Sequence, residues 1–249
     1  MKRLVSFFLA LAATASVPAT GGIPAESLGT VSYDVRYKLG AITTKVATAT
    51  ISWEEASWNG TPAYHSAALV RTTPIFRLFI SSDYVAETYF TRSDLTPLYF
   101  VNPFKRNKQD GKFEYVYQNG HGEIASTTVR GDDEPEYKTF PNDGTTLDLL
   151  SLLHFVRFVP LSDDSEPLEM HILMAGKSYP ALLEYLGTDD DKIPGIPAEK
   201  LHLRMTEHGL MENKSGNELY LWRATTPDHR LLCLETNLSS GRMICTIQQ

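Results

Sequence analysis

Apolar and polar residues alternate along most of the chain, most strictly from Val31 to Leu39, where every second residue is apolar. A period of two is typical of a strand that buries one face and exposes the other. Comparable runs continue as far as Arg242 to Ile247, separated by short segments rich in turn-forming residues. One of these segments, Ser57 to Pro62, contains the Asn-Gly pair that favours a tight hairpin. The pattern predicts an antiparallel meander of about ten to twelve strands.

One stretch has the period of an α-helix instead. Between Thr145 and Pro160, four apolar residues recur at helical spacing: Leu149, Leu152, Leu153 and Val156. Thr145 with an acidic residue three positions later is a helix start of the capping-box type, and Pro160 ends the run. We expect a helix over residues 147–158 whose apolar face is buried.

These elements predict one mainly β domain over residues 20–249, long enough to bury a sizeable core. A twisted antiparallel sheet of this many strands curls or closes, because an open sheet leaves two edges unpaired. We therefore expect a single half-open β-barrel or strongly curled sheet, with the helix as its plug or lid. Ala47 and Ala49 leave room on one wall, and the acidic segment from Gly131 to Gly144 is expected to be an irregular loop.

Residues 1–19 have the layout of a secretory signal peptide, with basic residues, then an apolar run, then small residues. The run is too short to span a bilayer, and no cysteine near the cleavage point offers a lipid anchor. We expect a periplasmic monomer without stable membrane insertion. Removal of Lys2 and Arg3 leaves 21 basic and 30 acidic residues, and this net charge of −9 disfavours nucleic acid and anionic lipid surfaces as partners.

Motifs of common enzymes and metal sites are missing from the sequence. There is no G-x-S-x-G, H-E-x-x-H, P-loop or G-x-G-x-x-G pattern, and the seven histidines form no close pair with ligand spacing. His202 and His208 would lie about 20 Å apart on an extended strand. We expect no metal, no cofactor and no catalysis; a hydrolase built from dispersed carboxylates is the minority alternative. An assembly or scaffold protein, with a broad exposed apolar patch, is another.

The mixed side of the helix carries most of the candidate ligand contacts. Arg157, His154 and Phe155 lie there, and Tyr89 and Trp222 on strands complete the set. In one interpretation the polar residues reach solvent or pair with a carboxylate. In the other, Arg157 stands beside an apolar wall at the barrel mouth and meets the head group of an amphiphilic ligand. The second predicts a carrier or sensor of an apolar or amphiphilic envelope molecule such as a lipid, unless the helix plugs the barrel completely.

Cys233 and Cys245 lie on the two arms of the last hairpin and would meet an oxidising compartment after export. A two-residue turn at Ser240-Gly241 places them on opposite faces of the sheet. A three-residue loop over 239–241 places them on the same face but not directly opposite each other. A disulfide therefore depends on the turn, since the bond requires Cα atoms within about 7 Å.

Four segments carry a shared pattern: Phe79–Phe100 with Glu87-Thr88-Tyr89 and Thr96-Pro97-Leu98-Tyr99-Phe100, Thr146–Leu153 with Arg157, Gly216–Trp222, and Leu234–Gly241. Together they resemble the bacterial domain of unknown function 3108 family, from near Gly29 to the C-terminus. After Trp222 the family usually has a Ser and an acidic pair, where this chain has Ala224 to Asp228. The resemblance implies a periplasmic or envelope protein of Gram-negative bacteria, built from antiparallel strands, without an established activity.

Overall fold

The computed structural model describes residues 23–76, 84–106, 109–118, 122–206 and 217–248. Within these ranges it has one α-helix, α1 (Leu149–Phe158), one 3-10 turn (Ala25–Ser27) and fifteen strands. The strands are β1 (Gly29–Leu39), β2 (Ile42–Trp58), β3 (Thr61–Thr72), β4 (Tyr84–Thr91), β5 (Pro97–Arg106), β6 (Gln109–Tyr117), β7 (Gly122–Arg130), β8 (Glu136–Asn142), β9 (Thr146–Asp148), β10 (Leu168–Met174), β11 (Lys177–Thr188), β12 (Ala198–Met205), β13 (Glu218–Ala224), β14 (Leu231–Leu238) and β15 (Gly241–Ile247).

The predicted mainly β fold is confirmed, with more strands than expected. β8 occupies the segment from Gly131 to Gly144, so the prediction that this segment is an irregular loop is wrong. Its residues pair in antiparallel register with β7, from Thr128 opposite Glu136 to Gly122 opposite Asn142. The expected leader, 1–19, and His208 lie outside the described residues.

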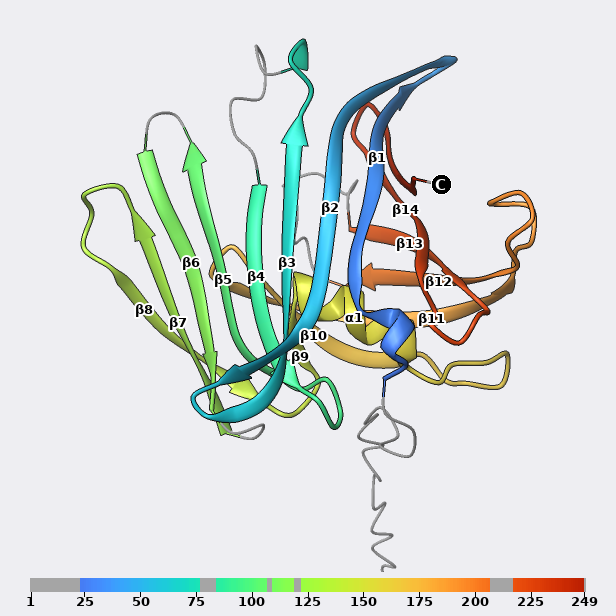
Figure 1. Cartoon of the computed structure of the whole chain (residues 1–249). Coiled ribbons are helices and arrows are strands. Elements are labelled where there is room, and N and C mark those ends of the chain that lie inside the picture. Colours follow the sequence, from blue (N-terminus) through green and yellow to red (C-terminus); the bar gives the residue numbers. More distant parts are fainter. Residues whose placement is uncertain (1–22, 77–83, 107–108, 119–121, 207–216, 249) are drawn as a thin grey trace, which may run out of the picture.

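All fifteen strands belong to one sheet, in the order β8-β7-β6-β5-β4-β3-β2-β1-β15-β14-β13-β12-β11-β10-β9. Every neighbouring pair is antiparallel except β9 and β10, which are parallel. The two edge strands, β8 and β9, are consecutive in the chain, so residues 143–145 connect one edge of the sheet to the other. The sheet curls into a nearly closed, barrel-like wall around α1, as Figure 1 shows.

The hairpin between β2 and β3 has the turn that its sequence predicts. Trp58 pairs with Thr61, which leaves Asn59 and Gly60 as a two-residue turn. Their φ angles are 50° and 82°, and two positive φ values are the requirement of a type I′ turn. Asn and Gly tolerate this conformation best, so the pair fixes the register of β2 and β3.

The helix begins later than the capping pattern predicts. Residues 146–148 form β9, which pairs with His171 to Leu173 of β10, and this pairing holds them in extended conformation. The N-cap is consequently Asp148, and the prediction that Thr145 starts the helix is wrong. At the other end, the N–H of Val159 donates to the carbonyl of Phe155 before Pro160 ends the helix as predicted.

Both sides of α1 are covered. Leu152 and Val156 are fully buried in a core cluster with β10 to β14, and Leu150 belongs to a second cluster with β4 to β7. The expected contrast between a buried apolar face and a mixed face at the mouth is wrong, because Leu153 is only partly buried whereas His154 is 3% exposed. The helix is therefore a plug inside the sheet. No helix in the described ranges is long and apolar enough to cross a membrane.

Candidate functional site

The helix starts on a buried carboxylate. Oδ1 of Asp148 accepts hydrogen bonds from the backbone N–H groups of Leu150 (3.0 Å) and Ser151 (2.8 Å). Its Oδ2 accepts from the hydroxyl groups of Ser151 (2.6 Å), Thr88 (3.2 Å) and Tyr117 (3.4 Å). Burial raises the pKa of Asp148, and the hydrogen bonds oppose that rise. Asp148 is thus the N-cap itself, rather than the acidic partner of a cap at Thr145, and it ties the helix to β4 and β6.

His154 lies one turn further along, inside an aromatic cluster. Its Nε2 is 2.7 Å from the Oγ of Ser66 on β3, and its ring lies 4.5 Å from the ring of Trp53 and 5.2 Å from that of Phe90, between centroids. Burial, with a smaller contribution from the charge of Arg157, lowers the pKa of His154 well below its ordinary value. The imidazole is therefore neutral at neutral pH.

Arg157 neither reaches open solvent nor pairs with a carboxylate. Its side chain is buried, and Nη2 donates to the backbone carbonyls of Asp228 (2.7 Å) and Ser27 (3.4 Å). The guanidinium also lies 4.9 Å from the ring centroid of Trp53 and 5.1 Å from that of Phe158. Burial lowers the pKa of Arg157 to about 10, so the group keeps its charge at neutral pH.

A second arginine, which the sequence reasoning missed, caps the end of the helix. Nη1 of Arg223 on β13 donates to the carbonyls of Val156 (2.9 Å), Arg157 (3.3 Å) and Val159 (2.8 Å). Its Nε donates to Glu199 at 2.6 Å. Nothing in the local pattern of β13 indicates this role, because the carbonyl groups come from a segment 64 or more residues away.

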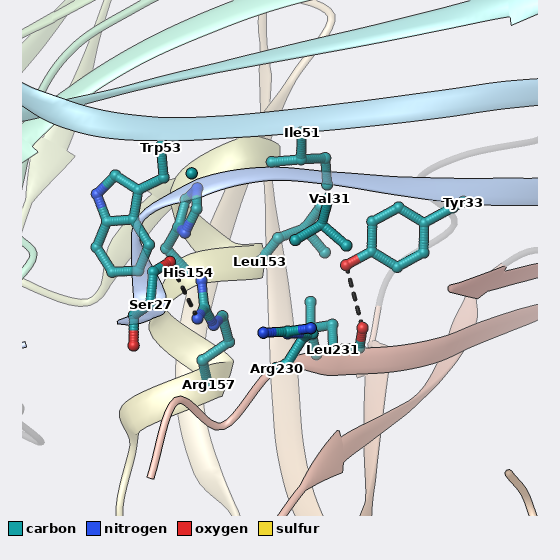
Figure 2. A pocket seen from close by; sticks show the side chains of 11 residues that line it. Ser27, Val31, Tyr33, Ile51, Trp53, Leu153, His154, Arg157, Arg230 and Leu231 are labelled. Carbon is teal, nitrogen blue, oxygen red and sulfur yellow. Dashed lines mark hydrogen bonds between the residues drawn. The ribbon is translucent and has the colours of Figure 1, made fainter. Parts of the chain in front are cut away.

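A small, partly open chamber of about 20 Å³ lies beside Arg157 and His154 in the described part of the chain, and its lining is drawn in Figure 2. The chamber lies between α1, the start of β1, β2 and the segment that enters β14. Its lining residues are Ser27, Gly29, Val31, Tyr33, Ile51, Trp53, Leu153, His154, Arg157, Arg230 and Leu231. A volume of this size holds a ligand of one to a few heavy atoms, about that of one or two waters.

A much larger groove of about 930 Å³ lies beside β10 and β11. Its apolar lining residues are Val159, Pro160, Leu161, Pro167, Leu168, Met170, Pro180, Ala181 and Leu182. Polar residues at the groove include Asp143, Glu166, Glu169 and His171. A narrow cavity of about 10 Å³ shares Leu168 and Met170 with the groove and extends to Phe155, one of the predicted ligand contacts. Ala47 and Ala49 are buried and line none of these cavities.

Tyr89 lies on the outer face of the sheet, because Thr88 and Phe90 on either side of it in β4 are the buried residues. Its ring lies 4.9 Å from that of Trp58 and 4.6 Å from that of His65. The predicted contact Tyr89 is thus separated from Arg157 by the thickness of the sheet.

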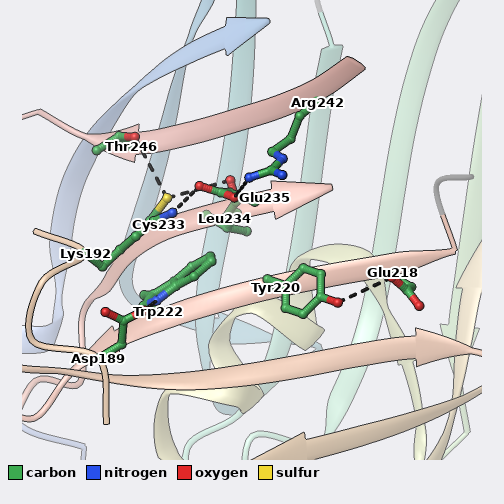
Figure 3. A network of polar contacts seen from close by, with 10 residues as sticks. All are labelled: Asp189, Lys192, Glu218, Tyr220, Trp222, Cys233, Leu234, Glu235, Arg242 and Thr246. Carbon is green, nitrogen blue, oxygen red and sulfur yellow. Dashed lines mark hydrogen bonds and ion pairs between the residues drawn. The ribbon is translucent and has the colours of Figure 1, made fainter. Parts of the chain in front are cut away.

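Trp222 faces outward from β13, where Figure 3 shows it within a polar network. Its Nε1 donates to Asp189 at 2.8 Å, and the Nζ of Lys192 lies 3.9 Å from its ring centroid. Lys192 also pairs with Glu235. Of the five predicted ligand residues, the structure brings together only Arg157 and His154.

The two cysteines are free, and the candidate disulfide is not formed. Leu238 pairs with Gly241, so the turn has two residues, Ser239 and Ser240. Cys233 is then opposite Thr246 and Leu234 is opposite Cys245, which places the two thiol groups on opposite faces. Of the two turns considered from the sequence, the two-residue turn is present, one residue earlier than Ser240-Gly241. The cysteines lie on opposite faces, as a two-residue turn requires.

Fold and site together define a class: a barrel-like antiparallel sheet plugged by one helix, with buried polar groups along that helix. Groups of three or more His, Cys, Asp or Glu that could hold a metal ion are absent from the described part of the chain. The chain belongs to the family described as protein of unknown function (DUF3108), whose model matches residues 32–245. The resemblance noted in the sequence is confirmed.

A solved structure supports the fold. A β-barrel-like protein of the domain of unknown function DUF1849 from Brucella abortus matches with a TM-score of 0.56 at 9% identity, over 88% of this chain and 95% of that one. A lipoprotein of Parabacteroides distasonis ATCC 8503, described as putative, covers 94% of this chain and 98% of its own at 11% identity, with a TM-score of 0.29 that is too low to indicate a shared fold. No curated protein matches the chain.

Proposed function

We propose that this protein is an exported, periplasmic carrier or sensor that holds an apolar or amphiphilic envelope molecule without catalysis, and that the ligand lies in the groove beside β10 and β11. The observation that carries the proposal is the groove itself, whose volume of about 930 Å³ is typical of small-molecule sites. The resemblance of residues 1–19 to a signal peptide supports export.

The groove is lined mainly by apolar residues, and several of them are partly exposed. Met170 and Ala181 are 3% and 2% exposed and lie at its floor, while Leu161, Leu168 and Leu182 are partly exposed. An apolar ligand that covers these partly exposed leucines removes their remaining apolar surface from water, and this burial favours binding. The plugged interior favours a ligand on this side of the sheet over one inside the barrel.

The polar residues of the groove restrict the head group. Asp143, Glu166 and Glu169 carry negative charge, and no Lys or Arg is among the lining residues that the structure describes. A carboxylate or phosphate head group would meet repulsion here, whereas a hydroxyl, amide or amine would find acceptors. The ligand is therefore expected to have a neutral or cationic polar end.

Native mass spectrometry of protein purified without detergent tests the proposal, together with titration of the uncharged fluorescent probe phenylnaphthylamine. We expect a co-purifying amphiphile or saturable probe binding. Leu182→Lys places a charge in the groove and should weaken binding at least about tenfold, corresponding to about 1.4 kcal/mol. Leu186→Lys is the matched control, because Leu186 lies on the same strand, is 46% exposed and does not line the groove.

Absence of both a co-purifying molecule and probe binding would overturn the proposal. Equal weakening by the two variants would place the site elsewhere. Turnover in a broad hydrolase screen would contradict the absence of catalysis.

An assembly or scaffold role is the second candidate. Leu39 and Ile42 pair at the tip of the β1–β2 hairpin and are 52% and 69% exposed. The tip projects beyond the neighbouring strands in Figure 1, and exposed apolar tips of this kind are contact points for partners. Under this alternative, Leu39→Ser with Ile42→Ser abolishes capture of an envelope partner and leaves probe binding unchanged.

A further inference from the structure

The chamber beside Arg157 has more polar atoms than hydrogen-bond partners. Four buried polar atoms of its lining residues have no partner within the described ranges: Ser27 Oγ, Trp53 Nε1, His154 Nδ1 and Arg157 Nε. Buried polar groups are nearly always paired, because an unpaired one loses its hydrogen bonds to water without replacement. Figure 2 shows the indole nitrogen of Trp53 turned away from the chamber, whereas the guanidinium of Arg157 lies beside it. The unpaired Nε of Arg157 therefore indicates that the cavity suits a polar occupant.

Three of the four unpaired atoms can donate a hydrogen bond. The indole N–H of Trp53 and the Nε–H of Arg157 can only donate, and the hydroxyl of Ser27 can donate as well. The Ser66 hydroxyl donates its single proton to the carbonyl of Ser52 at 2.7 Å, so the neutral His154 donates from Nε2 to Ser66 and its Nδ1 is an unpaired acceptor.

The chamber also has an excess of positive charge. Arg157 forms no ion pair with a described carboxylate, and its polar contacts are two backbone carbonyls. Arg230, whose guanidinium Figure 2 shows near that of Arg157, pairs with Asp228 at 2.9 Å. The Asp228 carboxylate also attracts Arg157, so one negative charge is shared by two guanidinium groups, and an incompletely compensated buried charge is unfavourable.

From these observations we infer that the chamber is a binding site for a small monovalent anion, of the size of a halide or formate, which serves as the counter-ion of Arg157. The volume of about 20 Å³ admits such an ion and excludes the hydrocarbon chain of an amphiphile. The site is separate from the proposed ligand groove and does not depend on it.

Crystals grown in bromide provide the direct test on the wild-type protein. Anomalous scattering should show a bromide within hydrogen-bond distance of the Arg157 guanidinium. Formate at the same ionic strength is the second arm and separates a halide site from a carboxylate site. A chamber that contains only water in both crystals would overturn the inference.

Thermal unfolding gives an independent readout. The melting temperature of the wild type should rise with the logarithm of bromide or formate concentration at constant ionic strength, with gluconate as the balancing anion, because a ligand of the native state stabilises it. Arg157→Met should abolish this slope. Arg204→Met, at an arginine with a 48% exposed side chain, should keep it.

Equal slopes in all three proteins would overturn the inference. If Arg157→Met does not fold, Arg157→Lys replaces it, since it removes the unpaired Nε donor and keeps a positive charge; a halved or smaller slope is then expected, and an unchanged slope counts against the site.

Discussion

Replacement of Asp148 by alanine should destabilise the fold by about 2–4 kcal/mol. Loss of a helix N-cap costs about 0.5–2 kcal/mol. The buried hydroxyl of Ser151 loses its acceptor at 2.6 Å and can turn to Thr88 Oγ1 at 3.0 Å, whereas the buried hydroxyl of Tyr117 loses its acceptor at 3.4 Å, which adds about 1–3 kcal/mol. Thr88 adds little, because it keeps the carbonyl of Tyr99 as an acceptor at 3.0 Å. Release of a buried charge offsets part of the sum.

The pH dependence of the free energy of unfolding, compared between wild type and Asp148→Asn, tests whether the carboxyl group of Asp148 is buried. Because the pKa of Asp148 in the folded protein is raised above the ordinary 3.8, the folded state binds the proton more tightly than the unfolded state. Its stabilising contribution is complete below pH 3.8 and is lost as the pH rises through the raised folded value. The free energy of unfolding of the wild type, relative to Asp148→Asn, should therefore increase as the pH falls toward 3.8.

Urea unfolding followed by tryptophan fluorescence at several pH values measures both quantities. Asp143→Ala is the matched control: Asp143 also accepts hydrogen bonds from a following N–H, at 2.9 Å, but its side chain is 52% exposed. It should cost under about 1 kcal/mol. The reasoning is refuted if Asp148→Ala lowers the free energy of unfolding by no more than Asp143→Ala does. It is also refuted if the difference in that free energy between wild type and Asp148→Asn does not change with pH.

Three further outcomes are expected. Arg223→Met should cost at least about 3 kcal/mol in urea unfolding, because it leaves the carbonyl groups at the helix end without their donor. Leu152→Ala should cost about 2–5 kcal/mol and more than Leu153→Ala, since Leu152 is fully buried and Leu153 only partly; the reverse order would contradict the observed packing. Cys233 and Cys245 should alkylate slowly at pH 8 until the protein unfolds, because burial raises the thiol pKa values to about 11 and about 12; mass spectrometry after iodoacetamide treatment measures this.

The local pattern determined the strands and several of their ends. β1 and β15 end at Leu39 and Ile247, where the alternation predicts, and the Asn59-Gly60 turn follows from two residues that tolerate positive φ. These features depend on neighbours in the chain, which a sequence displays directly. A curled sheet with a helical plug also followed, because a sheet of this size must deal with its edges.

Contacts between distant segments decided the rest. Asp148 became the N-cap because β10, from beyond the helix, pairs with the residues before it. His154 and Arg157 are polar residues on the mixed side of the helix. They are buried because β3 and the segment before β14 pack against that side. Tyr89 and Trp222 point away from the helix, since alternation separates two faces of a strand without stating which one the sheet encloses. The chamber and the groove arise from the same long-range packing, so local spacing in the sequence could not place them.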